Sequence, residues 1–177
     1  MMEVSDLDKE ILFKIRANVD VLITSIKNNW DLEGIKILEI APQIHKGVKG
    51  TFSKAMVETL DLSSDFQPTY VADLCRNNSA LIPDNSFDVV VVTEVLEHTL
   101  DPFFATMEIY RILKKGGRVF GSTPFDFRIH GPLPDCWRFT EHGLRQLFSL
   151  FEEIEIKPLE NPDRFLMPWH YTFCFKK

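Results

Sequence analysis

A run of four valines, Val89–Val92, inside the segment Phe87–Thr93 places the strongest constraint on how this chain folds. A short, unbroken β-branched run is typical of a strand that is buried on both faces of a parallel sheet. Crowding between β-branched side chains disfavours a helix, and the turn-forming residues 83–86 precede the run. The chain is therefore predicted to contain a central buried strand.

A helix with recognisable ends follows this strand. Asp101 is a suitable N-cap, and Pro102 suits the first helical position, where no amide hydrogen is needed. Lys114-Lys115 suits the last turn, and Gly116-Gly117 predicts the end of the helix. Arg118–Ser122 then has the pattern of another strand. Strand–helix–strand units are right-handed with parallel strands, so the segment predicts an α/β sheet.

The rest of the chain supplies further helices and strands. Ser5 and Asp8 can form a capping box for a helix of about two dozen residues. Its apolar stripe either packs on the sheet or over its mouth, or binds a partner. Thr140 is a suitable cap for a helix through Leu150. Strands are predicted at Ile35–Ile40, Ala55–Leu60, Thr69–Ala72, Phe151–Lys157 and Trp169–Lys176, of which the last two alternate as antiparallel or edge strands do.

Length and composition limit the class of protein. The 177 residues are predicted to form one domain, with an N-terminal helix in 1–30, a core in 35–122, a loop in 123–140, and a closing helix and strands in 141–177. A formal charge of −6 argues against nucleic acid as a partner. Since neither a secretion signal nor a membrane-length apolar run is visible, we expect a cytoplasmic protein without a membrane partner, either a monomer or a homodimer.

The three cysteines, Cys75, Cys136 and Cys174, lie far apart in no metal-like pairing. In a reducing compartment such residues are ordinary thiols of the core or the near-surface layer. The sequence therefore predicts no metal site.

Two motifs around the central strand carry a family resemblance. PDNSFDVVVVTEVLEH and EIYRILKKGGRVF resemble the central half of class I S-adenosylmethionine-dependent methyltransferases, in particular their type 11 small-molecule branch. The agreement extends over Ile35–Lys157, about two thirds of the chain. The resemblance implies a Rossmann-like, doubly wound, mostly parallel sheet of seven strands, with an antiparallel last strand and helices on both faces. It also implies S-adenosylmethionine as the cofactor and a small molecule as the acceptor.

The resemblance also implies where the cofactor lies. In open α/β sheets, ligands bind beyond the carboxyl ends of the strands, where the strand order reverses. The residues implied here are Glu39, Ala41, Pro42, Gln43, Asp61, Leu62, Asp73, Leu74, Thr93, Glu94, Val95 and Leu96.

Two of these acids have alternative interpretations. Asp61 follows Glu39 by 22 residues, a spacing at which an acid accepts hydrogen bonds from ribose hydroxyls, although Asp61 also suits a side-chain-capped turn. By resemblance Asp73 bonds the adenine amino group, although it also suits a turn or a helix cap.

The turn after the first strand departs from the family pattern. Ala41, Gln43 and His45 stand where the family has glycines, which let backbone amides approach the cofactor closely. Pro42 in addition removes a hydrogen-bond donor.

A long polar and aromatic loop, Ser122–Thr140, follows the fifth strand. Its segment HGPLPDCWRFT resembles an acceptor-side stretch of this branch, so Trp137 and Arg138 are predicted to contact the acceptor. His98, just past the fourth strand, is also predicted to contact the acceptor. His98 alternatively bonds a carbonyl, and the loop alternatively forms a small core in which Asp135 pairs with Arg138. His130 is the first candidate for a catalytic base, because the ordinary pKa of histidine is about 6.5. Asp135 and Asp126 are its rivals.

Two functions from different classes remain open. The first is transfer of a methyl group from S-adenosylmethionine to an oxygen or nitrogen of a small molecule, such as a sugar or another secondary metabolite. The second is a noncatalytic protein of the same fold that binds or assembles with a partner, which the substituted turn at Ala41–Gln43 favours. A nicotinamide-dependent oxidoreductase is a distant third, since no G-x-G-x-x-G motif follows the first strand.

Overall fold

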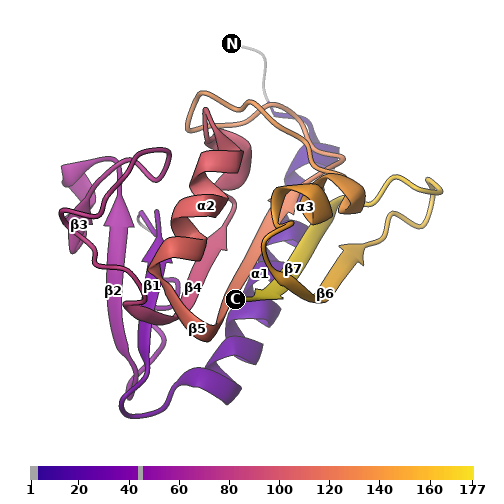
Figure 1. Cartoon of the computed structure of the whole chain (residues 1–177). Coiled ribbons are helices and arrows are strands. Elements are labelled where there is room, and N and C mark those ends of the chain that lie inside the picture. Colours follow the sequence, from indigo (N-terminus) through magenta and orange to yellow (C-terminus); the bar gives the residue numbers. More distant parts are fainter. Residues whose placement is uncertain (1–3, 44–45) are drawn as a thin grey trace.

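The structure is a computed structural model that describes residues 4–43 and 46–177. Seven strands form one sheet, with helices on both of its faces (Figure 1). The helices are α1 (Asp6–Trp30), α2 (Pro102–Ile112) and α3 (Glu141–Leu147), with 3-10 turns η1 (Ser64–Phe66) and η2 (Leu96–His98). The strands are β1 (Lys36–Ile40), β2 (Met56–Asp61), β3 (Tyr70–Val71), β4 (Phe87–Thr93), β5 (Leu113–Pro124), β6 (Glu152–Leu159) and β7 (His170–Lys176).

The strand order is β3-β2-β1-β4-β5-β7-β6. The first five strands in this order run parallel, and β7 is inserted antiparallel between β5 and β6. The direction of winding reverses between β1 and β4, which pair through Ile37–Glu39 and Val89–Val91. The predicted seven-stranded, doubly wound sheet with an antiparallel last strand is confirmed.

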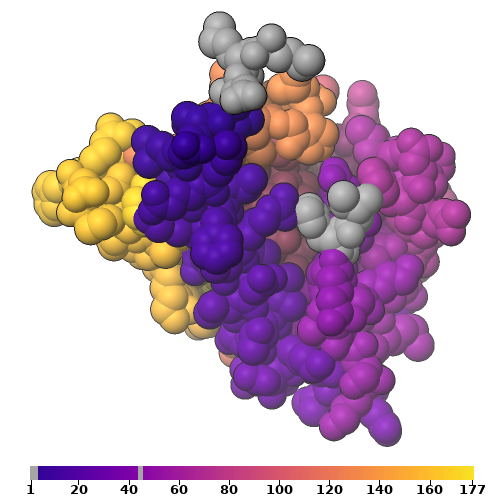
Figure 2. All heavy atoms as spheres, turned by 180° about the vertical axis from the view of Figure 1, so that it is seen from behind, coloured from indigo at the N-terminus to yellow at the C-terminus, as the bar shows by residue number. Residues whose placement is uncertain are grey.

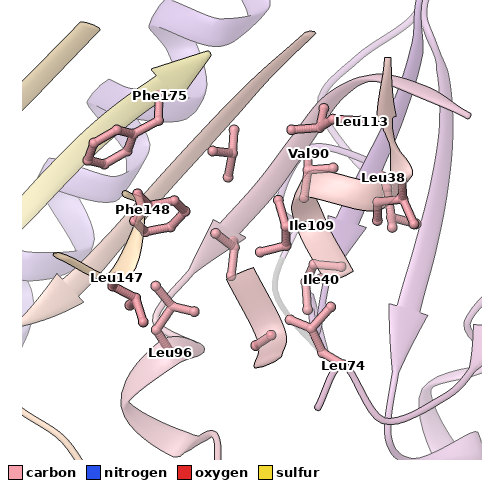
Figure 3. Close-up of a cluster of buried hydrophobic side chains, with 14 of the residues drawn as sticks. Leu38, Ile40, Leu74, Val90, Leu96, Ile109, Leu113, Leu147, Phe148 and Phe175 are labelled. Atoms are coloured by element: carbon pink, nitrogen blue, oxygen red, sulfur yellow. The ribbon is translucent and has the colours of Figure 1, made fainter. Parts of the chain in front are cut away.

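The core divides into two layers because side chains alternate across a buried strand. On one face Leu38 and Val90 pack with Ile109 of α2 and with Phe148, which follows α3 (Figure 3). Phe148 stacks on Phe175 of β7, with ring centroids 4.5 Å apart. On the other face, Ile37, Val89 and Val91 pack against Ile26 of α1. The four valines therefore belong to a strand that is covered on both sides, as their pattern predicts.

α1 crosses the back of the molecule, between the yellow C-terminal strands and the magenta segment of β2 and β3 (Figure 2). The N-cap half of the predicted capping box is present, since Ser5 Oγ accepts a hydrogen bond from the Asp8 amide at 3.1 Å, while the Asp8 carboxylate accepts one from the Ser5 hydroxyl at 2.7 Å. Among the described helices, none combines the length and the apolar character that a bilayer crossing would require.

The predicted end of α2 is wrong. Asp101 and Pro102 begin the helix as expected, but the helix ends at Ile112 and β5 begins at Leu113. The reason is long-range: the Gly116 amide donates to the Lys177 carbonyl at 2.8 Å, and the Lys177 amide donates to the Gly117 carbonyl at 3.0 Å. The two glycines therefore lie in an irregular stretch of β5 that meets the chain end, and do not cap a helix.

Candidate active site

A cavity of about 1050 Å³ lies at the carboxyl ends of β1, β2, β3 and β4, where the winding of the sheet reverses. α1 contributes one wall, including Ile15 and Arg16, and the loop at His130–Pro134 contributes another. In Figure 1 this loop, drawn in orange, passes over the same end of the sheet. Pockets for small molecules are typically about 300–1,000 Å³, so the cavity has room for a nucleoside cofactor and a second ligand.

The turn after β1 has the backbone conformation that glycine favours, although no glycine is present at Ala41–Gln43. Ala41 has φ 48° and Gln43 has φ 50°, both in the left-handed region that favours glycine. Such a conformation costs a residue with a Cβ roughly 1–2 kcal/mol. Ala41, Pro42 and Gln43 line the cavity, but the cavity stays open beside them. His45, the third substituted position, lies outside the described residues.

Glu39 holds the segment that follows this turn. Its Oε1 accepts a hydrogen bond from the Val48 amide at 2.7 Å, and its Oε2 accepts one from the Lys49 amide at 2.9 Å. Gly47 has φ 49°, and a Cβ there would overlap Glu39 Oε1. Burial raises the pKa of Glu39, and the two amide hydrogen bonds lower it in part. Both carboxylate oxygens are thus satisfied by the protein itself.

Asp61, at the end of β2, has one free oxygen. Oδ1 accepts a hydrogen bond from the Ser63 amide at 2.9 Å, as in the side-chain-capped turn that was one of its two interpretations. Oδ2 is buried and has no partner among the described residues, while the side chain as a whole is 4% exposed and lines the cavity. A buried carboxylate oxygen without a donor is unfavourable unless a ligand supplies one.

The neighbouring strand ends bring more of the predicted cofactor residues to the same wall. Leu62, Asp73 and Leu74 line the cavity. Asp73 Oδ1 accepts a hydrogen bond from the Cys75 amide at 2.8 Å, so one of its oxygens stabilises a turn. Leu96 differs from the rest, because it lies in the core cluster under α2 (Figure 3).

The end of β4 is anchored by a hydrogen bond from a buried imidazole. Thr93, Glu94 and Val95 line the cavity, and Glu94 has φ 53°. Asn18 Nδ2 donates to His170 Nδ1 at 2.9 Å, which leaves His170 Nε2–H to donate to Glu94 Oε1 at 2.7 Å. Burial opposes ionisation of Glu94, but the hydrogen bonds that its carboxylate accepts from His170 and from Ser122 Oγ outweigh it, so the pKa of Glu94 is lowered.

Two histidines face a buried carboxylate at the loop end of the cavity. Glu97 is 0% exposed, and its Oε1 has no hydrogen-bond partner among the described residues. This atom lies 3.8 Å from His98 Nε2 and 3.8 Å from His130 Nε2. Burial, and then the negative charges of Glu94 and Asp135, raise the pKa of Glu97 well above its ordinary value. Burial likewise lowers the pKa of His130, although the Asp135 charge opposes that shift.

Asp135 lies behind His130 and fixes its ring. Its Oδ2 accepts hydrogen bonds from the His130 amide at 2.9 Å and from His130 Nδ1 at 3.0 Å. Arg138 grips the same carboxylate with two bonds, at 2.6 and 2.8 Å. Burial would raise the pKa of Asp135, but the Arg138 fork and the His130 amide hold it below its usual range. The pairing of Asp135 with Arg138, one of the two interpretations of the loop, is therefore present.

Three other predicted residues do not line the cavity. Asp126 Oδ2 accepts a hydrogen bond from Arg164 Nη1 at 2.7 Å, away from the cavity wall. Trp137 donates its indole N–H to the Thr99 carbonyl at 2.8 Å and is 40% exposed. Arg138 is occupied by Asp135 and by loop carbonyls. Of the predicted acceptor-side residues, His98 and His130 line the cavity.

Sequence reasoning did not assign Glu97 and His170 to the site. For Glu97 the pair Glu97-His98, directly after a strand end, was a usable signal. For His170 no local signal exists, because its contact with Glu94 bridges 76 residues.

The sheet and its cavity define a Rossmann-like α/β protein with a cavity at the reversal of strand order, the place where such sheets bind their ligands. A family model described as "Methyltransferase domain" matches residues 33–121, just over half of the chain. The chain therefore belongs to this methyltransferase family, and its fold is that of the class I S-adenosylmethionine-dependent enzymes. The class uses S-adenosylmethionine, the cofactor predicted from the sequence.

One curated relative is a ubiquinone biosynthesis O-methyltransferase from Proteus mirabilis, 37% identical over 62 residues. The match covers 35% of this chain and 25% of that protein, so the chain spans about a quarter of the relative's length.

Solved structures share the fold at low identity. An S-adenosylmethionine-dependent methyltransferase from Methanosarcina mazei has a TM-score of 0.65 at 20% identity, with 86% of this chain and 96% of that chain covered. The [4+2]-cyclase SpnF has a TM-score of 0.68 at 12% identity, with 91% and 80% covered.

Proposed function

We propose that this protein binds S-adenosylmethionine in the cavity and transfers its methyl group to a hydroxyl or amine of a small molecule. The observation that carries the proposal is the free, buried Oδ2 of Asp61 at the wall of a nucleoside-sized cavity. Ribose presents two adjacent hydroxyl donors, and one of them would satisfy this oxygen. The 22-residue spacing from Glu39 to Asp61 supports the same role.

Other residues would hold the remaining parts of the cofactor. The turn at Ala41–Gln43 brings main chain to the cavity along the path that glycines usually take. Asp73 and Leu74 lie beside the next strand end, where the adenine ring would sit. S-adenosylmethionine, when bound, supplies an electrophilic methyl group on a sulfonium.

The acceptor would occupy the loop end of the cavity. His98, Phe127 and His130 give this end two polar groups and an aromatic wall. His130 donates Nδ1–H to Asp135, so its Nε2 lone pair is left to attract the proton of an acceptor hydroxyl or amine. Holding two reactants in line accounts for much of the rate of such a transfer. The O-methyltransferase from Proteus mirabilis supports an oxygen acceptor.

Calorimetric titration with S-adenosylmethionine and with S-adenosylhomocysteine tests the cofactor step. We expect one molecule bound per chain, and about tenfold or weaker binding for Asp61→Asn, because a charge-assisted hydrogen bond is lost. Asp65→Asn is the matched control, since this exposed residue lies four positions on and outside the cavity wall. Absence of heat for the wild type, or equal affinities for the two variants, would refute the cofactor step.

Turnover of a panel of hydroxyl- and amine-bearing small molecules tests the transfer step. His130→Ala is expected to lower the rate about 100-fold or more while S-adenosylmethionine affinity is kept. His142→Ala is the control, because His142 is an exposed residue of α3. An unchanged rate in His130→Ala would remove this residue from the mechanism.

A second candidate is a protein that binds the nucleoside but does not transfer the methyl group. The substituted turn favours it, since Ala41 and Gln43 occupy strained backbone and Pro42 lacks an amide hydrogen. The cyclase SpnF shares this fold. Cofactor binding without S-adenosylhomocysteine formation on any acceptor of the panel would support this candidate.

A further inference from the structure

Three groups with free lone pairs converge at the loop end of the cavity. Glu97, His98 and His130 each offer one ligand atom, and these atoms all lie within 4.8 Å of one another. The Nε2 atoms of both histidines lie 3.8 Å from Glu97 Oε1. Glu97 is fully buried and its Oε1 lacks a hydrogen-bond partner among the described residues. A buried carboxyl oxygen that faces two ring nitrogens is satisfied either by a shared proton or by a cation bound among the three groups.

The tautomers of both rings are fixed by oxygens on their far sides. His98 Nδ1 lies 3.0 Å from the Pro134 carbonyl, which can only accept, so Nδ1 carries the hydrogen. His130 Nδ1 lies 3.0 Å from Asp135 Oδ2, a carboxylate that Arg138 holds ionised. In each neutral ring the Nε2 atom is therefore the lone pair that points toward Glu97.

This arrangement is the one that metal-binding histidines show. A ligating imidazole almost always donates its other N–H to a carboxylate or a backbone carbonyl, which fixes the ring and increases its basicity. Here one ring uses a carboxylate and the other a carbonyl.

We propose that Glu97, His98 and His130 bind a divalent transition-metal ion, with Zn²⁺ as the ion of first choice. Two imidazoles and one carboxylate form a donor set of catalytic zinc sites, which leave a further position open. An ion about 2.1 Å from each donor places the donor atoms roughly 3.4 Å apart. The two 3.8 Å separations would therefore contract by a few tenths of an ångström. The site was not predicted from the sequence, because its donors come from η2 and from a loop 32 residues away.

The open position would face the cavity, since His98 and His130 both line it. A hydroxyl acceptor could reach the ion there, which would favour oxygen over nitrogen as the methylated atom. In that state His130 is a ligand, and the ion replaces its Nε2 as the group that makes the hydroxyl acidic. This consequence rests on the proposed function, whereas binding of the ion does not.

The test is calorimetric titration of the chelator-treated full chain with Zn²⁺, without S-adenosylmethionine. We expect one equivalent bound by the wild type, and at least about tenfold weaker binding by Glu97→Gln and by His98→Gln. His142→Gln is the matched control, because His142 Nε2 also lies 3.7 Å from a carboxylate, that of Glu141, but at an exposed site without a second imidazole. It should bind like the wild type.

Co²⁺ as a spectroscopic probe of the wild type keeps the test independent of how the variants fold. We expect visible d–d bands without a near-ultraviolet thiolate band, because the proposed donors are nitrogen and oxygen. A thiolate band, no stoichiometric binding, or equal affinities in folded Glu97→Gln and wild type would overturn the proposal, leaving a shared proton between the three groups. Since no cofactor is present, failure here does not affect the proposed function, and failure of S-adenosylmethionine to bind does not affect this site.

Discussion

Two buried glutamates, Glu39 in the cavity wall and Glu97 behind two histidines that line the cavity, have opposite hydrogen-bond environments. Glu39 accepts main-chain hydrogen bonds on both oxygens, from Val48 and Lys49. Glu97 has one oxygen without a partner among the described residues, and its other oxygen lies 3.4 Å from Thr123 Oγ1. Both oxygens of the first carboxylate are engaged by main chain after the β1 turn, while one oxygen of the second is left without a donor in the same part of the chain. Position at a strand end is therefore a poorer guide to function than the partners of each oxygen.

Replacing each glutamate by glutamine should give the largest difference in the free energy of unfolding between two matched variants. Glu39→Gln places an amide NH₂ against a main-chain N–H, so we expect the free energy of unfolding to fall by about 3 kcal/mol. Glu97→Gln should change it by less than about 1 kcal/mol, because the new NH₂ can donate to an imidazole Nε2. Denaturant unfolding of both variants measures the difference. Equal losses would end the distinction between the two glutamates.

Gly47→Ala examines how closely Glu39 is held. We expect a loss of about 2 kcal/mol or more in the free energy of unfolding, because the new Cβ meets both a positive φ and the Glu39 carboxylate. Gly34→Ala is the control: it has φ 82° but open space around it, so only the backbone penalty of about 1 kcal/mol applies. If the two variants lose equal stability, Glu39 moves freely and the turn does not depend on it.

Ala41→Gly should stabilise the protein, whereas most substitutions by glycine destabilise. Ala41 has φ 48°, so glycine relieves backbone strain, and we expect a gain of up to about 1 kcal/mol in thermal or denaturant unfolding. Ala72, which also lines the cavity, is not among the residues with positive φ. Ala72→Gly should therefore lose about 0.5–1 kcal/mol. Losses at both positions would mean that the cofactor turn is not strained.

Asp31 extends the comparison to a third buried carboxylate and to pH. It accepts hydrogen bonds from the Ser53, Lys54 and Ala55 amides at 2.7–3.1 Å. Burial opposes its ionisation, but these bonds outweigh it and lower the pKa of Asp31 to about 2. Because the folded pKa lies below the unfolded value of about 3.9, the stabilisation is complete above that value and is lost as the pH falls toward 2.

Asp31→Asn should therefore be less stable than the wild type at neutral pH, and the gap should narrow between about pH 4 and pH 2. Unfolding by denaturant at several pH values measures it, with the exposed Asp65→Asn as the control. A gap that does not change with pH would mean that the Asp31 charge contributes nothing.

The sequence predicted the sheet because its signals are local. The four valines, the Asp101-Pro102 cap and the N-cap at Ser5 each act within a few residues, and all three appear as expected. The end of α2 was mistaken because its glycines pair with Lys177, a contact that nothing nearby in the sequence indicates.

The candidate site divides in the same way. Strand ends such as Asp61 and Thr93 line the cavity because the topology of a parallel sheet puts them there. The positions of loop side chains depend on hydrogen-bond partners that lie far along the chain. Asp126 accepts from Arg164, and Trp137 donates to the Thr99 carbonyl. The cluster of Glu97, His98 and His130 depends on how the two imidazole rings are rotated. Hydrogen bonds to Pro134 and Asp135 set this rotation, which residue spacing does not indicate.

His170, in a strand next to the edge of the sheet, contacts Glu94 at the end of the central strand β4. It belongs to β7, outside residues 33–121, yet it supplies the imidazole that pairs with Glu94 at the tip of β4. A fragment cut at the limits of the shared family segment would retain most strand tips of the cavity but would leave Glu94 without the imidazole that donates a hydrogen bond to it. The antiparallel hairpin is thus a foundation of the pocket, and any minimal version of this protein has to include it.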